Sequence, residues 1–270
     1  MRKTNYAIQE IMIKYPIYIA KELFMSGHSK WHSIKHKKAA TDSKRGRIFT
    51  RMIKEMTVAA RTGGGDVDSN PRLRLAVTTA KSQNMPAENI KKAIMRGTGE
   101  LPGVTYEDVS YEGYGPGGAA VIVRTLTDNK NRTVAELRHL LAKNGGNLGE
   151  TNSVAWMFDR RGYFVVESSV ADEEKLMDIA LGAGADDLRD NGDNFEIITT
   201  PENFETVRAA LETAGITTVE AEISMIPQNY VKLEGKNAQT MIKLIDVLED
   251  HDDIQNVWSN FDVDESDIGE

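Results

Sequence analysis

The spacing of apolar residues changes once along this 270-residue chain, and that change limits the possible folds more than any other feature. Up to Gly97, apolar residues recur every three or four positions, which is the period of a helix that buries one face. After a linker at 98–104 they form short runs separated by turn residues, which is typical of strands alternating with helices. The sequence therefore predicts a helical N-terminal part followed by an α+β part.

Three helices are predicted in the N-terminal part. The first covers about 44–61 and ends at the glycine run 63–65. The second opens at Asn70-Pro71, since Asn is a good cap and Pro fits the first helical position. Pro86 opens the third helix, which Gly97 is expected to close. These segments predict a small helical bundle over about 42–97.

The α+β part shows a nested order. Between 160 and 222 the predicted elements are strand, helix, two strands joined at Asn191-Gly192-Asp193, helix and strand, which is the ferredoxin-like order. Strand, helix and strand precede this unit, the last at 154–158, and a strand at about 224–233, a helix and a strand follow it. The expected fold class is multi-domain α and α+β: an N-terminal helical bundle followed by two ferredoxin-like α+β domains, one inserted in the other.

Five regions follow from this pattern. They are an N-terminal extension at 1–24, a basic arm and helical bundle at 25–100, a split α+β domain at 101–159 and 223–262, an inserted ferredoxin-like α+β domain at 160–222, and an acidic tail at 263–270. The extension has neither the apolar run of about 20 residues that a spanning helix needs nor the features of a signal peptide. We therefore expect no membrane partner. The absence of cysteine excludes disulfides and fits the cytoplasm.

The charge is divided as sharply as the apolar pattern. Residues 26–100 carry 16 basic and six acidic side chains, a net charge of +10, whereas residues 101–270 carry a net charge of −20. The stretch 25–61 alone holds ten Lys and Arg against two acids. Such a stretch is typical of a surface that contacts the phosphate backbone of a nucleic acid, although a solvated helix face would look similar.

The basic residues of the first predicted helix recur at helical spacing. Lys44, Arg47, Arg51 and Lys54 share one face, which we expect to point outward. Upstream, Trp31 could stack on a base or pack on the bundle. The predicted nucleic-acid-binding residues are His28, Lys30, Trp31, His32, Lys35, His36, Lys37, Lys38, Lys44, Arg45, Arg47, Arg51, Lys54, Arg72 and Arg74.

A second candidate contact lies at a helix start. Thr133 with Glu136 forms a capping-box pattern, and Lys130 and Arg132 beside it could hold a phosphate. A plain capped turn also explains the pattern. The glycine cluster at 113–118 is followed by a strand, so it predicts a hairpin rather than a nucleotide site.

No catalytic site, metal site or cofactor is predicted. His28, His32 and His36 recur every four residues, but the lysines among them oppose a cation. The acidic run 249–253 is interpreted as a solvated helix exit, and a docking role stays open because carboxylates oppose the dipole there. Without a nucleophile–base pair, we expect a non-enzymatic protein.

A series of motifs also occurs in one order along the chain. They are SGHSKW at 26–31, KHKKAATDSKRGRIFTR at 35–51, GGGD at 63–66, NPRLR at 70–74, YEGYGPGG at 111–118, DNKNRTVAELR at 128–138, GGNLG at 145–149, SMIP at 224–227 and LIDVLEDHDDIQNVWSNFD at 244–262. From Met25 to about Asp262 this series resembles the YebC family, to which the mitochondrial translational activator of cytochrome c oxidase also belongs.

The resemblance implies three domains, the third inserted in the second, and a cytoplasmic regulator of gene expression without catalytic residues. Members of the family are described as DNA-binding transcriptional regulators, and others help ribosomes through proline-rich stretches. We take a DNA-binding transcriptional regulator as the leading hypothesis. The alternative is a ribosome-associated factor that binds ribosomal or transfer RNA.

Overall fold

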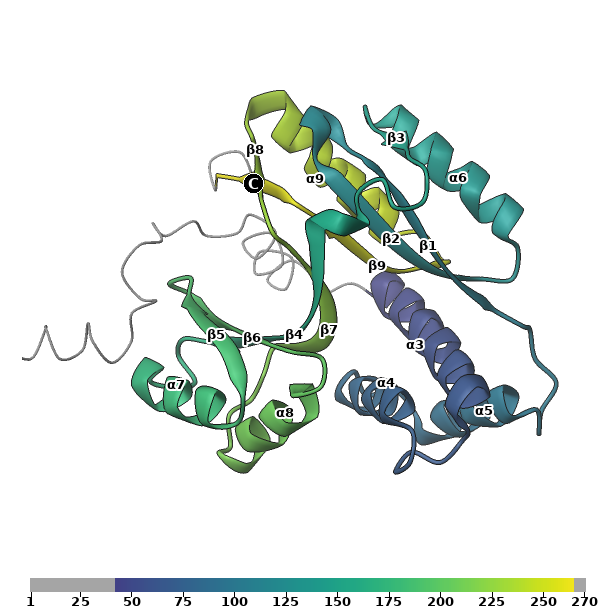
Figure 1. Cartoon of the computed structure of the whole chain (residues 1–270). Helices are drawn as coiled ribbons and strands as arrows, with labels where there is room; N and C mark the ends of the chain where they lie inside the picture. The colour runs from purple at the N-terminus through teal and green to yellow at the C-terminus, as the bar shows by residue number, and fades with distance from the viewer. Residues whose placement is uncertain (1–41, 265–270) are drawn as a thin grey trace, which may run out of the picture.

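The computed structural model describes residues 42–264, which form three lobes (Figure 1). The elements are α3 (Asp42–Gly63), α4 (Pro71–Ser82), α5 (Ala87–Thr98), β1 (Glu107–Tyr114), the 3₁₀ turn η1 (Pro116–Gly118), β2 (Ala120–Thr127), α6 (Lys130–Lys143), β3 (Asn147–Leu148), the 3₁₀ turn η2 (Ala155–Met157), β4 (Phe158–Glu167), α7 (Glu173–Gly182), β5 (Ala185–Asp190), β6 (Asn194–Thr199), α8 (Phe204–Thr213), β7 (Glu220–Pro227), β8 (Val231–Leu233), α9 (Gly235–Glu249), β9 (Ile254–Ser259) and β10 (Phe261–Val263). This mixture of helices and antiparallel sheets confirms the expected combination of α and α+β structure.

The first lobe is a bundle of α3, α4 and α5 around its own core, which includes Met56, Leu73 and Ile90. The predicted start of α4 is confirmed, because the Asn70 side chain accepts the Leu73 amide and Pro71 occupies the first turn. Gly97, however, does not close α5. The helix continues to Thr98, and Gly99 takes the left-handed conformation instead.

The second lobe has a four-stranded antiparallel sheet in the order β3-β1-β2-β9, with α6 and α9 supplying the other half of its core. β1 and β2 form a hairpin through η1, as the glycine cluster predicted. β8 and β10 add a separate two-stranded parallel pair. Because the sequence-adjacent β1 and β2 lie side by side at its centre, this sheet does not have the strand order of a ferredoxin-like unit.

The third lobe has a four-stranded antiparallel sheet in the order β5-β6-β4-β7, with α7 and α8 packed against it. The chain runs β4-α7-β5-β6-α8-β7, the βαββαβ order that the sequence predicted. β4 and β7 are longer than expected and begin or end beside the second lobe, as Figure 1 shows. Positions 159/160 and 222/223, where the domain division was expected, therefore fall inside strands.

Two further predictions on local structure are wrong. Residues 154–158 are not a separate strand, because 155–157 form η2, Val154 precedes it and Phe158 begins β4. The expected single strand at 224–233 is the end of β7 and, after a break, β8. Among residues 42–264, no helix is long and apolar enough to cross a membrane.

Candidate nucleic-acid interface

Most of the predicted basic arm lies outside the described residues. This applies to His28, Lys30, Trp31, His32, Lys35, His36, Lys37 and Lys38, and so also to the histidines weighed above as metal ligands. Lys44 and Arg45 fall in the first turn of α3, but their side chains are also outside what the structure describes. Arg47 is therefore the first of the predicted contacts whose side chain the structure describes.

The cationic face of α3 does not point uniformly outward. Lys54 is only 7% exposed, and its Nζ donates to Asp253 Oδ1 at 2.8 Å. The same ammonium donates to the carbonyls of Asp252 at 3.0 Å and Leu126 at 3.4 Å. It also lies 5.3 Å from the centre of the Tyr106 ring. The outward orientation expected for Lys54 is wrong, because this side chain joins the bundle to the second lobe.

The other two cations of this face whose side chains the structure describes, Arg47 and Arg51, lie beside the same acidic turn. Arg47 forms an ion pair of 3.3 Å with Asp250. Burial lowers the pKa of Arg51, and the nearby carboxylates of Glu249 and Asp250 act against that shift. The acidic run at the end of α9 therefore has the docking role that the sequence left open, and the element that it holds is α3 of the same chain.

A second ion cluster joins the bundle to the sheet of the second lobe. Arg72 of α4 reaches Glu55 of α3 at 2.7 Å and Asp108 of β1 at 2.9 Å. Arg124 of β2 reaches the same two carboxylates at 2.9 and 2.7 Å. Burial alone would raise the pKa of Asp108, but hydrogen bonds from Arg124 and Arg72 outweigh it and lower the pKa.

Arg74, the last of the predicted contacts, is bound within the protein as well. Its Nε donates to the Val67 carbonyl at 3.2 Å, its Nη2 donates to the Asp68 carbonyl, and Nη1 lies 4.0 Å from Glu205 of α8. Arg72 and Arg74 thus shape the bundle and its contacts. This reduces the charge that each can offer to an external phosphate.

The start of α6 differs from the predicted capping box. Asn129 is the cap and accepts the Arg132 amide at 3.1 Å, while Thr133 is buried one turn into the helix. Thr133 donates to Asp253 Oδ2 at 2.8 Å, and Arg132 donates to the same oxygen at 2.6 Å. Lys130 pairs with Glu107 at 2.7 Å. Both candidate phosphate contacts therefore have carboxylate partners already.

Asp253 is the centre of these contacts. Burial would raise the pKa of its carboxyl, but hydrogen bonds from Lys54, Arg132 and Thr133 outweigh burial and hold the pKa far below its ordinary value. The residue is 4% exposed and is ionised with partners from α3, α6 and the end of β2. A buried charge of this kind is stable only when it is paired and fully hydrogen-bonded.

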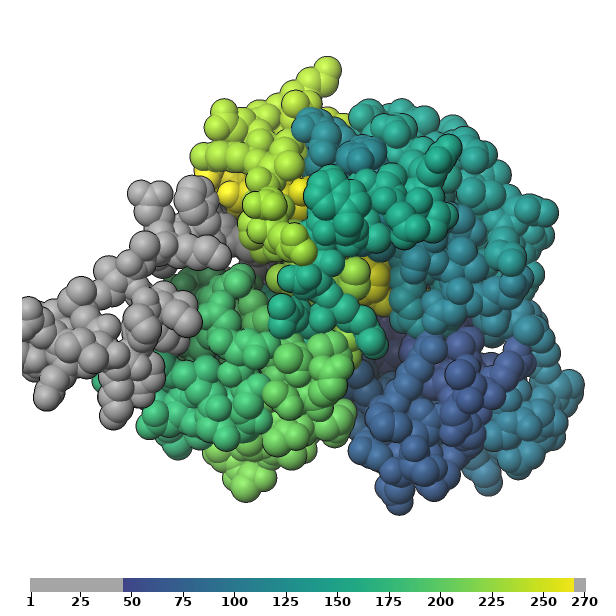
Figure 2. Space-filling view, in the orientation of Figure 1, coloured from purple at the N-terminus to yellow at the C-terminus, as the bar shows by residue number. Residues whose placement is uncertain are grey.

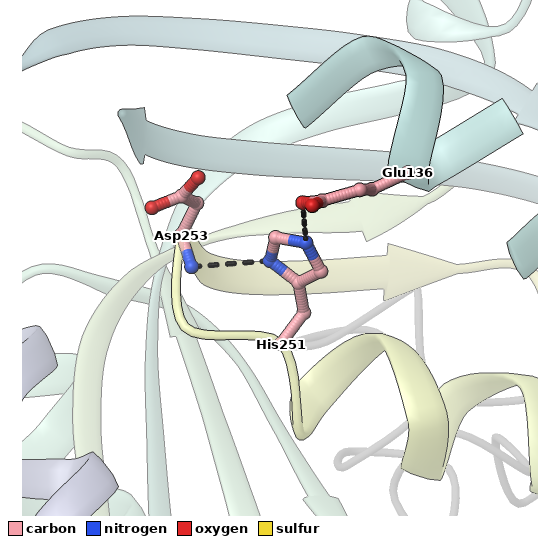
Figure 3. A group of neighbouring side chains, drawn as sticks. All are labelled: Glu136, His251 and Asp253. Atoms are coloured by element: carbon pink, nitrogen blue, oxygen red, sulfur yellow. Dashed lines mark hydrogen bonds and ion pairs between the residues drawn. The ribbon is translucent and has the colours of Figure 1, made fainter. Parts of the chain in front are cut away.

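Beside Asp253, Glu136 and His251 offer ligand atoms within 4.8 Å of one another, at the wall of an open cleft of about 580 Å³ (Figure 3). His251 Nε2 lies 2.8 Å from Glu136 Oε2, and its Nδ1 accepts the Asp253 amide at 3.1 Å. Both ring nitrogens of His251 thus have hydrogen-bond partners, and Lys54 and Arg132 already neutralise Asp253. The trio has the chemistry of an internal hydrogen-bond network and not of a metal site.

The bundle keeps four exposed cations for which the described part of the chain records no ion pair. They are Arg61, Lys81, Lys91 and Arg96. Lys92 of the same surface pairs with Glu88 at 3.4 Å. Within residues 42–264, the basic surface of the bundle that remains open to solvent therefore lies on the outer sides of α4 and α5 and at the end of α3, at residues outside the predicted set.

Sequence reasoning missed an exposed tryptophan. Trp156 was expected inside a strand, where one face would be covered, but in η2 it is 67% exposed. Figure 2 shows the green-teal segment that contains η2 on the visible surface near the junction of the three lobes. The glycine-rich turn before it was the available sign that this part of the chain is a loop.

Comparison with known proteins places the sequence in one family. Residues 29–100 match the description "TACO1/YebC protein N-terminal domain", and residues 106–261 match "TACO1/YebC second and third domain".

Curated relatives agree with this match. A protein of Desulfatibacillum aliphaticivorans is 56% identical over 91% of this chain and 100% of its own length, and one of Solibacter usitatus is 60% identical over 90% and 98%. Both are named "Probable transcriptional regulatory protein". The crystal structure of a conserved hypothetical protein from Aquifex aeolicus is similar, with a TM-score of 0.79 and 45% identity over 86% of this chain and 96% of that one. The resemblance seen in the sequence is confirmed: the chain belongs to the TACO1/YebC family.

Proposed function

We propose that this protein is a nucleic-acid-binding regulator of gene expression, and that it acts as a DNA-binding transcriptional regulator in the cytoplasm. The observation that carries the proposal is its similarity, at 56–60% identity over about nine tenths of the chain, to proteins named as transcriptional regulators. The net charge of +10 over residues 26–100 supplies the physical means of contacting a polyanion. The proposal assigns no catalytic residue and no cofactor.

In this proposal the binding charge comes from the arm and from the outer side of the bundle. Arg47, Lys54, Arg72 and Arg74 have partners within the protein, so each would lose those contacts on moving to a phosphate. The lysines Lys35, Lys37 and Lys38 and the exposed side chains of Lys81 and Lys91 carry the contact instead.

The net charge of −20 over residues 101–270 disfavours contacts to phosphate groups on the other two lobes. The protein therefore binds in one orientation, with its bundle towards the nucleic acid.

The test is crosslinking in growing cells followed by capture of the tagged protein and sequencing of the attached DNA and RNA. Discrete chromosomal peaks near promoters, lost in the variant Lys35→Glu/Lys37→Glu/Lys38→Glu, support a transcriptional regulator. A matched control, Lys175→Glu/Lys236→Glu/Lys243→Glu, changes the charge equally at exposed sites on α7 and α9 and should keep the peaks. Abundant ribosomal and transfer RNA with only diffuse DNA would instead assign the protein to translation.

A further inference from the structure

Trp156 is the most exposed large apolar side chain in the described part of the chain. Its exposed fraction is 67%, whereas the other three such residues, Val104, Val170 and Val219, range from 38% to 49%. Leaving a tryptophan in water gives up one of the largest gains in burial that a side chain can provide. An indole held outside the core therefore needs an explanation.

The loop that carries Trp156 is fixed by the buried carboxylate of Glu112. Glu112 of β1 is 8% exposed, and its carboxylate accepts the backbone amides of Asn152 at 2.7 Å and of Val154 and Ala155 at 2.8 Å each. Hydrogen bonds to these amides lower the pKa of Glu112 against the opposing effect of burial, so the carboxylate stays ionised. A buried charge is thus used to fix a surface loop.

The ring itself is also fixed. Trp156 Nε1 donates to the Ser153 carbonyl at 3.1 Å, and the Tyr114 hydroxyl donates to the same oxygen at 3.1 Å. The N–H of the indole is therefore already in use, and what remains open to a partner is the aromatic surface. Because the ring is already ordered, binding loses little conformational entropy.

The surroundings of Trp156 are polar. Thr151 and Asn152 in the same loop are exposed, and so is Arg160 in β4, for which no ion pair is recorded in residues 42–264. Its immediate neighbours along the chain, Ala155 and Met157, are half-buried, and Val154 and Phe158 are buried. The other exposed large apolar side chains lie on separate segments of the chain. A protein-binding hot spot would be expected inside a wider apolar patch, whereas a base can stack on a single ring in polar surroundings.

We propose that Trp156 is a stacking platform for an unpaired base of the bound nucleic acid, with the Glu112-fixed loop as its support. The inference rests on the proposed function and extends it. It adds a contact to the flat face of a base, at a site that lies outside the basic bundle. Stacking on one ring tolerates any base, so the site distinguishes unpaired from paired strands rather than one sequence from another. The nearby exposed Glu150 keeps this loop from acting as a phosphate site.

Fluorescence and affinity measurements on the full chain test the proposal. The chain has three tryptophans, and Trp258 is buried with its Nε1 bonded to Ser224 at 2.9 Å, so a Trp31→Phe background makes Trp156 the exposed reporter among the described residues. Ten-nucleotide oligouridylate and oligothymidylate should quench this fluorescence, and Trp156→Phe in the same background should remove the change. Quenching by both probes indicates stacking alone, and quenching by oligouridylate only indicates an added contact to the RNA sugar.

Affinity separates this inference from the proposed function. Trp156→Ala should weaken binding of the single-stranded probes about tenfold, Trp156→Phe should recover most of the loss, and binding of a duplex of equal length should not change. Val219→Ala, also at an exposed apolar residue, is the matched control and should bind as the unaltered protein does.

If Trp156→Ala binds single strands normally while Lys35→Glu/Lys37→Glu/Lys38→Glu does not bind, the stacking site is wrong and the proposed function stands. If the unaltered protein binds neither single strands nor duplex, the proposed function fails.

Discussion

Two buried carboxylates show how single residues organise this molecule. Glu112 is satisfied by three backbone amides of one loop, whereas Asp253 is satisfied by the side chains of Lys54, Arg132 and two threonines. In both cases the cost of removing the charge from water is offset only by a full set of donors. Replacing either carboxylate by an amide of the same shape should therefore lower the stability of the protein.

Glu112→Gln should destabilise the protein by about 1–3 kcal/mol, because an amide NH₂ would face backbone N–H groups that now donate to a carboxylate oxygen. Hydrogen exchange at the amides of Asn152, Val154 and Ala155 should become faster. Urea unfolding and exchange measurements check both effects. Glu150→Gln, at an exposed position of the same loop, should change the stability by less than about 0.5 kcal/mol. Equal effects of the two changes would show that Glu112 does not hold the loop.

Asp253→Asn should cost on the order of 3 kcal/mol near pH 7, because it leaves the Lys54 ammonium buried without its anion. The folded pKa of Asp253 lies below its value in the unfolded chain, about 3.9, so its contribution is complete above about pH 5 and decreases as the pH falls through that range. The difference in free energy of unfolding between the two proteins should therefore shrink from pH 5 to pH 2.

The matched control for this pH dependence is Asp250→Asn, which removes a carboxylate from an exposed pair with Arg47. Exposed pairs contribute at most about 1 kcal/mol, so the free energy of unfolding of this variant should stay within that value of the unaltered protein at every pH. If Asp253→Asn lowered the free energy of unfolding by the same amount at every pH down to 2, the ionised carboxylate would not be the source of the stability.

At the scale of elements, α3 performs three tasks with three faces. One face packs on α4 and α5, a second carries Lys54 to the end of α9, and a third brings Glu55 to Arg124 of β2. Gly97 permits the first contact, since a Cβ at this position would lie 2.5 Å from the Thr57 carbonyl oxygen and 2.6 Å from Ala60 Cβ. The glycine that the sequence suggested as a helix end is a site of close helix packing.

Gly97→Ala should therefore separate α3 from α5 and lower the free energy of unfolding by about 1–3 kcal/mol, in spite of the higher helix propensity of alanine. Gly46→Ala is the control in α3, because nothing lies within 4 Å of its Cβ position and propensity alone should stabilise the protein by about 0.5–1 kcal/mol. Thermal and urea unfolding of both variants provide the measurement. Gly97→Ala would disprove the packing role if it stabilised the protein as Gly46→Ala does.

The elements that sequence reasoning found are those whose signals are local. The Asn70 cap, the hairpin at 191–193 and the apolar stripe of α3 each depend on residues within one or two turns of chain. The prediction of a strand at 154–158 failed because the apolar residues there face different ways. Val154 and Phe158 enter a core, while Trp156 points out of a loop that is fixed by Glu112, which lies 42 residues before Val154.

At the scale of the whole molecule, the sequence shows that positive charge is concentrated in the N-terminal part. It does not show that some of this charge forms ion pairs within the protein. Some of the positive charge of α3 is used to hold the bundle on the acidic end of α9, through pairs as far apart as residues 54 and 253. No local pattern identifies such pairs, because only the fold brings them together. Each lobe has its own apolar core, and Leu75 of α4 also packs against the core of the third lobe. The two ion clusters connect the first lobe to the second.

This arrangement predicts how the bundle can be released. Lys54→Met and Arg132→Met each remove one cation from Asp253, but only Lys54 belongs to the bundle. In a background of Arg124→Met, which weakens the second ion cluster, Lys54→Met should detach the bundle, and Arg132→Met should leave it docked. Small-angle scattering should show a larger radius of gyration for the first double variant only. Its amides in α3 should also exchange faster, and its free energy of unfolding should fall by about 3 kcal/mol relative to the background. Equal dimensions for the two double variants would mean that contacts other than Lys54–Asp253 hold the lobes together.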